Sequence, residues 1–268
     1  MTKKEDMYME KKNIVIIFID ALRTKNLSLY GYDKETDKNL KKIAREGILF
    51  KNHFSVSNST APALTSVLTG KYPKNHGIIH QLPYTRHEEM ERIEKIKFWL
   101  PTFLKSNGYE TIAIDWISFW FTKDFDYYGE GEKKSTTFNS AHDITEFALS
   151  KINQANQPFF LFLHYWDTHF PFPTTDYKSS SDEKDIEETL KSIENEKQRE
   201  YLKKRIPPER GLFTIHDIIN KYNLSIQNVD REIGKLYNFL KEKDLWVKTI
   251  FIVLGDHGEI LTEHGIYF

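Results

Sequence analysis

The sequence contains no cysteine. This absence excludes disulfide bonds, metal sites built from thiolates and any reaction that uses a cysteine or a residue made from cysteine. A charge imbalance is also missing, because 38 lysines and arginines stand against 39 aspartates and glutamates, for a formal net charge of −1. Nucleic-acid binding usually leaves a strong basic excess, so we expect no nucleic-acid partner.

Long apolar runs are absent as well. The longest are Ile14–Ile19 and Phe159–Leu163, far below the roughly 20 residues that a bilayer crossing needs. Residues Met1–Lys12 carry charges of both signs and lack the apolar stretch and cleavage site of a signal peptide. These features predict a cytoplasmic protein with no membrane span, and they leave its oligomeric state open.

What the sequence has is enough apolar material for a large core. Of 268 residues, 39% are hydrophobic and 14% aromatic, which excludes global disorder. Strand-like and helical segments alternate, which predicts an α/β fold, a three-layer αβα sandwich with a mostly parallel central sheet. The expected strands are Asn13–Ile19, Ile48–Phe54, Glu110–Asp115, Pro158–His164 and Lys248–Leu254, and the expected helices are Lys38–Glu46, Ala61–Thr69, Phe98–Ser106, His142–Asn153 and Leu224–Lys241.

We expect a short N-terminal tail, residues 1–12, followed by a single domain, residues 13–268. Two stretches interrupt the alternation of strands and helices within this domain. His80–Lys97 is polar and predicts a surface excursion. Residues 176–210 are rich in Ser, Glu and Lys and predict a charged helical insertion between two core strands. The insertion is either a solvated helix without a role or a lid.

Several expected strands end in side chains that can bind metal. The first is followed by Asp20, the fourth by His164, Asp167 and His169, and the last by Asp256-His257 between Gly255 and Gly258. In parallel sheets, chemistry collects at the carboxyl ends of the strands. A carboxylate beside an imidazole suits Zn²⁺ or Mn²⁺, whereas Ca²⁺ prefers oxygen ligands throughout. The alternative is that the two aspartates are turn or helix caps and that His257 is incidental.

Thr60 starts a predicted helix and has two interpretations. A threonine at this place is usually an N-cap, and Pro62 fits the first helical turn. The functional interpretation is a hydroxyl nucleophile, whose alkoxide a helix N-terminus and a bound cation would both stabilise.

Taken together, these motifs resemble the sulfatase family of the alkaline phosphatase superfamily. Residues 13–31 are similar to the family's opening strand, metal aspartate and following loop, and residues 160–171 to its substrate-histidine strand. The segment 60–70 resembles the nucleophile motif C/S/T-x-P-x-x-x-x-x-L-T-G. Residues 256–259 and 263–265 resemble the second metal motif.

The chain departs from the family pattern at several positions. Formylglycine sulfatases oxidise a Cys or Ser where this chain has Thr60, and the arginine expected four residues later is Leu64. The Gly-Lys-Trp-His segment expected near residue 115 is instead Asp115-Trp116-Ile117-Ser118. Family members are nearly twice as long, and the chain looks truncated after the second metal motif. Threonine nucleophiles occur in related phosphodiesterases, nucleotide pyrophosphatases and phospho-group transferases.

The resemblance implies a metal-dependent hydrolase of sulfate, phosphate or phosphonate esters with a small-molecule substrate. One divalent ion (Mn, Zn or Ca) is expected on Asp20, Thr60, Asp256 and His257, with Thr60 as nucleophile. His169 would protonate the leaving oxygen or hold a non-bridging oxygen, and His164 is the second choice. The remaining candidates, for substrate binding, are Lys71, Asp167 and Arg23. The alternative is a catalytically silent, metal-binding module that keeps the fold without turnover.

Overall fold

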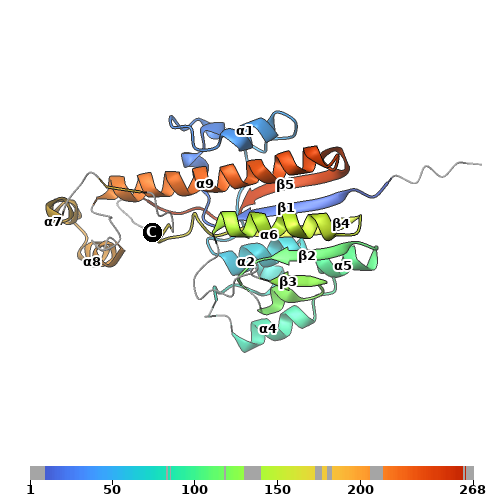
Figure 1. Ribbon diagram of the computed structural model, residues 1–268. Helices are drawn as coiled ribbons and strands as arrows, with labels where there is room; N and C mark the ends of the chain where they lie inside the picture. Colours follow the sequence, from blue (N-terminus) through green and yellow to red (C-terminus); the bar gives the residue numbers. More distant parts are fainter. Residues whose placement is uncertain are drawn as a thin grey trace, which may run out of the picture.

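The computed structural model describes residues 10–82, 84, 86–117, 119–129, 140–172, 177–179, 183–205, 214–261 and 263. Five parallel strands form its middle layer (Figure 1). Their order across the sheet is β3 (Tyr127–Gly129), β2 (Glu110–Ile114), β4 (Phe159–Tyr165), β1 (Asn13–Ile19) and β5 (Thr249–Gly255). Because neighbouring strands are parallel, their connections cross over the sheet and place helices on its faces. The predicted α/β sandwich is confirmed.

Helices cover both faces of the sheet. On one face, α6 (Ala141–Gln154) and α9 (Ile215–Glu242) bury their apolar sides against the strands, and α1 (Lys38–Ala44) packs on α9. The other face is covered by α2 (Thr60–Thr69), α4 (His87–Glu94) and α5 (Leu100–Ser106), with α3 (Pro73–His76) beside α2. The short 3₁₀ helices are Thr24–Asn26, Ser28–Tyr30, Phe119–Thr122 and Trp246–Lys248.

The long helix α9 starts at a capping box. The hydroxyl of Thr214 accepts the N–H of Asp217, whose carboxylate accepts the N–H of Thr214. Farther along, Asp230 accepts the N–H groups of Asn39 and Leu40 and so caps α1. Gly234 permits this close approach, because a Cβ there would lie 2.5 Å from the Asn39 side chain. These contacts fix α1 on the outer side of α9.

The predicted strand at Ile48–Phe54 is wrong. This segment has no regular secondary structure, and the exposed fractions of Ile48, Phe50 and Phe54 are 81%, 67% and 80%. Its apolar residues resemble a strand, but no described strand lies beside it to complete a ladder. An apolar pattern alone therefore did not make this segment part of the sheet.

The polar stretch His80–Lys97 is only in part the expected surface excursion, because it contains helix α4. Ile93 on α4 is buried in the core, and the Glu89 carboxylate accepts the N–H groups of Ile79 and His80. With only Met90 and Ile93 as apolar positions, the helix lacks a strong periodic signal.

The charged insertion folds as α7 (Glu183–Lys191) and α8 (Glu196–Arg205), near the start of α9 (Figure 1). Leu190, Ile193 and Leu202 join a small apolar cluster with Ile218 and Tyr222 of α9. The rest of the expected insertion, at 176, 180–182 and 206–210, lies outside the described residues, as does the expected tail up to residue 9.

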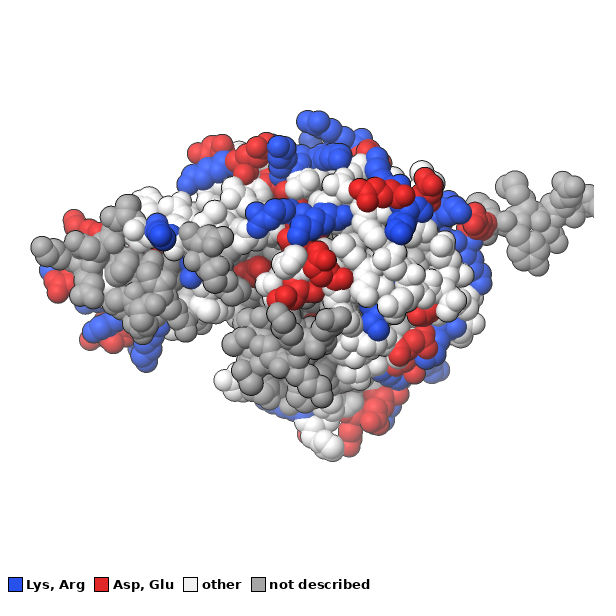
Figure 2. Space-filling model, in the orientation of Figure 1, with Lys and Arg blue, Asp and Glu red and all other residues white. Residues whose placement is uncertain are grey.

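Charged side chains of both signs intermingle over the face seen in Figure 2, most densely along the rim formed by α1 and α9. This mixture agrees with the near-zero net charge of the whole sequence. Among the described residues, no helix combines the length and the apolar character that a membrane crossing requires.

Candidate active site

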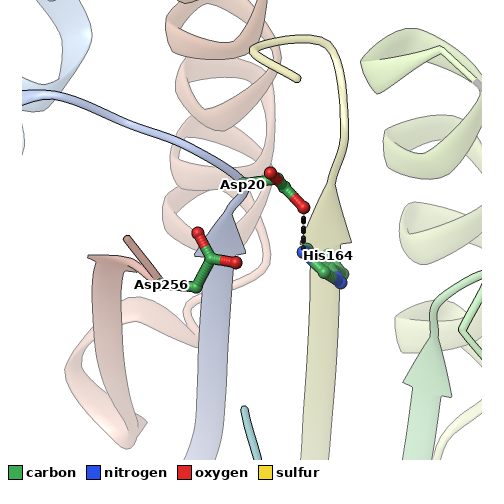
Figure 3. Close-up of side chains that lie close together, drawn as sticks. All are labelled: Asp20, His164 and Asp256. Carbon is green, nitrogen blue, oxygen red and sulfur yellow. Dashed lines mark ion pairs between the residues drawn. The ribbon is translucent and has the colours of Figure 1, made fainter. Parts of the chain in front are cut away.

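Three neighbouring strands bring the metal-capable side chains together. Asp20 follows β1, His164 lies in β4, and Asp256 follows β5 (Figure 3). The strand β1 pairs with both others, so that Phe18 lies beside His164 and Ile19 beside Gly255. One ligand atom from each of Asp20, His164 and Asp256 lies within 4.8 Å of the other two. The sheet register therefore builds a compact cluster from distant segments.

The cluster has polar atoms that its own hydrogen bonds leave unsatisfied. Asp256 Oδ1 accepts the N–H groups of Ala21 at 2.9 Å and of His257 at 2.7 Å. Asp256 Oδ2, Asp20 Oδ1 and His164 Nε2 are buried without a hydrogen-bond partner in the described part of the chain. Buried polar atoms normally have partners, so three such atoms in one place suit a ligand.

Electrostatics favours a cation at the same place. Burial, followed by the negative charge of Asp256, raises the pKa of Asp20 well above its ordinary value. Two buried carboxylates repel each other in a low-dielectric site, and a divalent cation between them removes that repulsion. Carboxylate oxygens and imidazole nitrogens together match Zn²⁺ and Mn²⁺. The donor set therefore fits the divalent ion that the sequence predicts.

The hydroxyl of Thr60 reaches this cluster. Thr60 Oγ1 lies 3.3 Å from Asp20 Oδ2 and 3.3 Å from His257 Nε2. Thr60 is the first residue of α2, and Ser59 holds the N-cap position without a side-chain capping bond. The N–H of Ala61 is instead satisfied by Gln81 Oε1 at 2.8 Å. The hydroxyl is thus directed at acidic and imidazole groups and does not cap its own helix.

His257 directs its Nε2 atom at the cluster. Its Nδ1 lies 2.7 Å from the carbonyl oxygen of Gly258 and must carry the proton of that bond, because a carbonyl only accepts. In the neutral imidazole, Nε2 then holds the lone pair, and it lies 3.5 Å from Asp256 Oδ2. This tautomer suits a metal ligand.

His164 is completely buried, and its partner is a residue that the site prediction left out. Its Nδ1 lies 2.9 Å from Asp115 Oδ1, and its Nε2 lies 3.7 Å from Asp20 Oδ2. The sequence singles out Asp115 only as a departure from the family's Gly-Lys-Trp-His segment. A carboxylate at the end of the predicted strand Glu110–Asp115 was the available signal, but nothing in the sequence pairs it with His164.

The other predicted site residues lie in different surroundings. Asp167 contacts the first turn of α6, where it accepts the N–H of Ala141, and burial raises its pKa to about 7. His169 is half-buried, with Nδ1 2.6 Å from the carbonyl oxygen of Phe170. Neither residue belongs to the compact Asp20–His164–Asp256 cluster.

Arg23 and Lys71 differ in accessibility. Arg23 is 8% exposed and pairs through Nη2 with Glu263, while its Nη1 is buried without a hydrogen-bond partner in the described structure. Lys71 is exposed and lines a cavity of about 290 Å³ that also borders Asp256. Tyr72 and His53 line the same cavity. Lys71 is thus the accessible cation of the two.

One departure from the family pattern has a structural explanation. Leu64, in place of the expected arginine, is fully buried in the apolar cluster between α2 and the sheet. A guanidinium at this position would need a buried partner, so the site uses the position for packing.

Comparison with known proteins shows the family of the chain. The Sulfatase family model matches residues 12–268. An arylsulfatase of Clostridium perfringens is 23% identical over 322 aligned residues, which cover 95% of this chain and 64% of that protein. Human iduronate 2-sulfatase is 24% identical, with 94% of this chain and 56% of that protein covered.

Solved structures share the fold at low identity. A protein in complex with its substrate D-glucosamine-2-N,6-O-disulfate matches with a TM-score of 0.68 and 20% identity, covering 97% of this chain and 68% of that one. The phosphonate monoester hydrolase of Agrobacterium radiobacter gives a TM-score of 0.65 at 16% identity, covering 95% and 64%.

The matches differ in length from this chain, which spans 64% of the Clostridium arylsulfatase and 62% of a Formosa agariphila sulfatase. The family model nevertheless extends over nearly every residue from the first strand onward. Its range includes Asp20, Thr60 and Asp256, the residues that meet in the cluster. The chain belongs to the sulfatase family.

Proposed function

We propose that this chain carries the catalytic centre of a metal-dependent ester hydrolase in which Thr60 is the nucleophile. The observation that carries the proposal is the position of Thr60 Oγ1, 3.3 Å from both Asp20 Oδ2 and His257 Nε2. Three buried polar atoms of the same site have no hydrogen-bond partner among the described residues. A hydroxyl that served only as a helix cap would bond to its own helix.

Asp20, Asp256 and His257, with Thr60, are the proposed holders of the cation. When bound, a divalent ion would lower the pKa of the Thr60 hydroxyl and neutralise charge on the transferred group. Asp20 Oδ2, at 3.3 Å, is within reach of the hydroxyl proton. The N-terminus of α2 adds a favourable partial positive charge at the same oxygen.

The proposed reaction transfers the phosphoryl or sulfuryl group to Thr60 Oγ1. The new bond forms to phosphorus or sulfur while the bond to the ester oxygen breaks, and His169 gives the leaving oxygen its proton. Water then attacks the phosphorus or sulfur of the threonine ester, the bond to Thr60 Oγ1 breaks, a proton from the water returns to that oxygen, and sulfate, phosphate or phosphonate leaves. Lys71, at the cavity that borders Asp256, would attract the anionic substrate.

The chemistry of threonine favours phosphate or phosphonate esters over sulfate esters. Formylglycine is made from cysteine or serine, and this chain offers neither at position 60. Among proteins of the same fold, one is named a phosphonate monoester hydrolase and another a lipoteichoic acid synthase. Their names support a phosphorus substrate as well as a sulfate.

The test is an activity survey of the purified protein. Aryl sulfate, aryl phosphate, bis-aryl phosphate and aryl phosphonate are each assayed with Mn²⁺, Zn²⁺ and Ca²⁺, with Thr60→Ala as the blank. We expect turnover of a phosphorus ester that the blank lacks. Turnover of aryl sulfate alone would overturn the substrate assignment, and metal binding without any turnover would leave a silent binding module.

A further inference from the structure

Asp115 and His164 form a buried pair behind the proposed cation site. Both residues are almost inaccessible, with exposed fractions of 2% and 0%. Asp115 follows β2 and His164 lies in β4, which are neighbours in the sheet. The pair therefore belongs to the rigid centre of the molecule.

Hydrogen bonds keep Asp115 ionised. Its Oδ1 accepts the N–H of Trp116 at 2.8 Å, and its Oδ2 accepts the hydroxyl of Tyr128 at 2.5 Å. Burial alone would raise the pKa of Asp115, but its interaction with His164 and these bonds outweigh it and lower the pKa. An ionised carboxylate only accepts, so His164 Nδ1 carries the proton of the 2.9 Å bond to Asp115 Oδ1.

Aromatic rings fix the plane of the imidazole. The Trp166 ring lies 4.2 Å from the His164 ring, centroid to centroid, and Phe18 meets it edge-on at 5.9 Å. With Nδ1 tied to Asp115, the opposite nitrogen is held toward Asp20, 3.7 Å from Oδ2. That nitrogen, Nε2, is buried and has no hydrogen-bond partner among the described residues.

We propose that His164 is a further ligand of the divalent cation and that Asp115 is its positioning residue, which holds the Nε2 lone pair toward Asp20 and Asp256. This inference rests on the proposed function, because it requires the cation. A carboxylate behind a ligating histidine fixes its tautomer and raises its basicity. His164 then binds the cation and does not act as the proton donor.

The first experiment measures affinity for Zn²⁺ and Mn²⁺ by calorimetry on metal-stripped protein. Asp115→Asn keeps the shape of the side chain but loses its charge, and we expect affinity to fall about 10- to 100-fold. The matched control is Asp126→Asn, since Asp126, directly before β3, bonds to Thr111 of β2 and to Lys105 of α5. The control should bind both metals like the unsubstituted protein.

The second experiment needs no variant. Nitrogen NMR of ¹⁵N-histidine-labelled protein should show His164 with Nδ1 protonated, and Zn²⁺ should shift its Nε2 resonance. If Asp115→Asn does not fold, Tyr128→Phe takes its place in the calorimetry. We expect the metal affinity of this variant to fall a few-fold, because Asp115 loses the hydrogen bond from the Tyr128 hydroxyl.

The outcomes separate the two proposals. A protein that binds neither metal would overturn the cation of the proposed function. If the protein binds metal but neither Asp115→Asn nor Tyr128→Phe changes the affinity, or the Nε2 resonance does not respond, the inference fails. The cation site on Asp20, Asp256 and His257 would then stand without His164.

Discussion

The strands β4 and β5 flank β1 on opposite sides, and both have nearly uninterrupted apolar sequences. Every residue of β4 is buried, whereas Ile250 and Ile252 of β5 are 49% and 41% exposed. The difference comes from position, because β4 lies between two strands and β5 is at an edge of the described sheet.

The same contrast extends to the histidines at the site. On the β4 side, His164 is held by the carboxylate of Asp115 within the protein interior. On the β5 side, the His257 side chain is 13% exposed and is held by the carbonyl of its own neighbour, Gly258. One half of the site is fixed by tertiary packing and the other by a local loop.

The most severe test removes the Thr60 hydroxyl, which lies 3.3 Å from both Asp20 Oδ2 and His257 Nε2. Thr60→Ala should lower turnover by about 10⁴-fold or more, because no other group replaces the nucleophile. Metal affinity should fall only in part, because three of the four proposed ligands remain, and the thermal midpoint should change little, since the hydroxyl does not cap α2. Thr60→Ser should keep part of the activity. Turnover and melting are measured side by side, and an alanine variant that melts lower yet still turns over would make Thr60 a structural residue.

Truncating one side chain in β4 and one in β5 should lower the free energy of unfolding by different amounts. Leu161→Ala in β4 removes a fully buried side chain and should cost about 2–5 kcal/mol of unfolding free energy. Ile252→Ala in β5 should cost about 1 kcal/mol, because 41% of this residue is already exposed. Urea unfolding of both variants gives the two values. Equal costs would mean that β5 is covered in solution.

The pH dependence of the unfolding free energy tests Asp167, a buried residue shortly after β4. Burial raises the pKa of Asp167 to about 7, above its value of 3.8 in an unfolded chain. Between these values the folded state binds more protons, so stability should fall as pH rises, by at most about 1.4 kcal/mol per pH unit. Asp167→Asn should remove this part of the slope. An unchanged slope in unfolding experiments from pH 4 to 7.5 would contradict the buried carboxyl.

The smallest effect is expected at the accessible β5 side. Lys71→Ala should raise KM a few-fold, about 1 kcal/mol, and leave kcat unchanged, because a long-range attraction acts on substrate and transition state alike. Lys74→Ala, at a neighbouring exposed lysine, is the control and should change neither constant. A loss confined to kcat would instead give Lys71 a role in the chemical step.

Sequence reasoning reached the parts of this molecule that depend on local pattern. The runs at β1, β4 and β5 were recognisable because each is continuously apolar, and the polar residues after them marked the site edge. Thr60 stood out through its motif. Local pattern also identified the body of α9, although its capping box at Thr214 moves the start from Leu224 to Ile215.

The features that depend on spatial order could not be derived in this way. The apolar residues of Ile48–Phe54 gave no information on whether a strand would lie beside them. Asp115 and His164 meet because β2 neighbours β4, and no spacing in the chain encodes that pairing. Gln81 reaches the start of α2 from a loop without regular structure.

The hydrogen bond from the Ala21 amide to Asp256 Oδ1 has a consequence for measurement. Ala21 has a φ of 53°, and its N–H is held by a carboxylate of the cluster. Its amide proton can exchange with solvent deuterium only when that carboxylate moves away. The exchange rate of this proton therefore reports how often the site opens. A cation that holds Asp256 in place should slow this exchange. Ala21 is thus an internal reporter of occupancy that needs no substitution and no substrate.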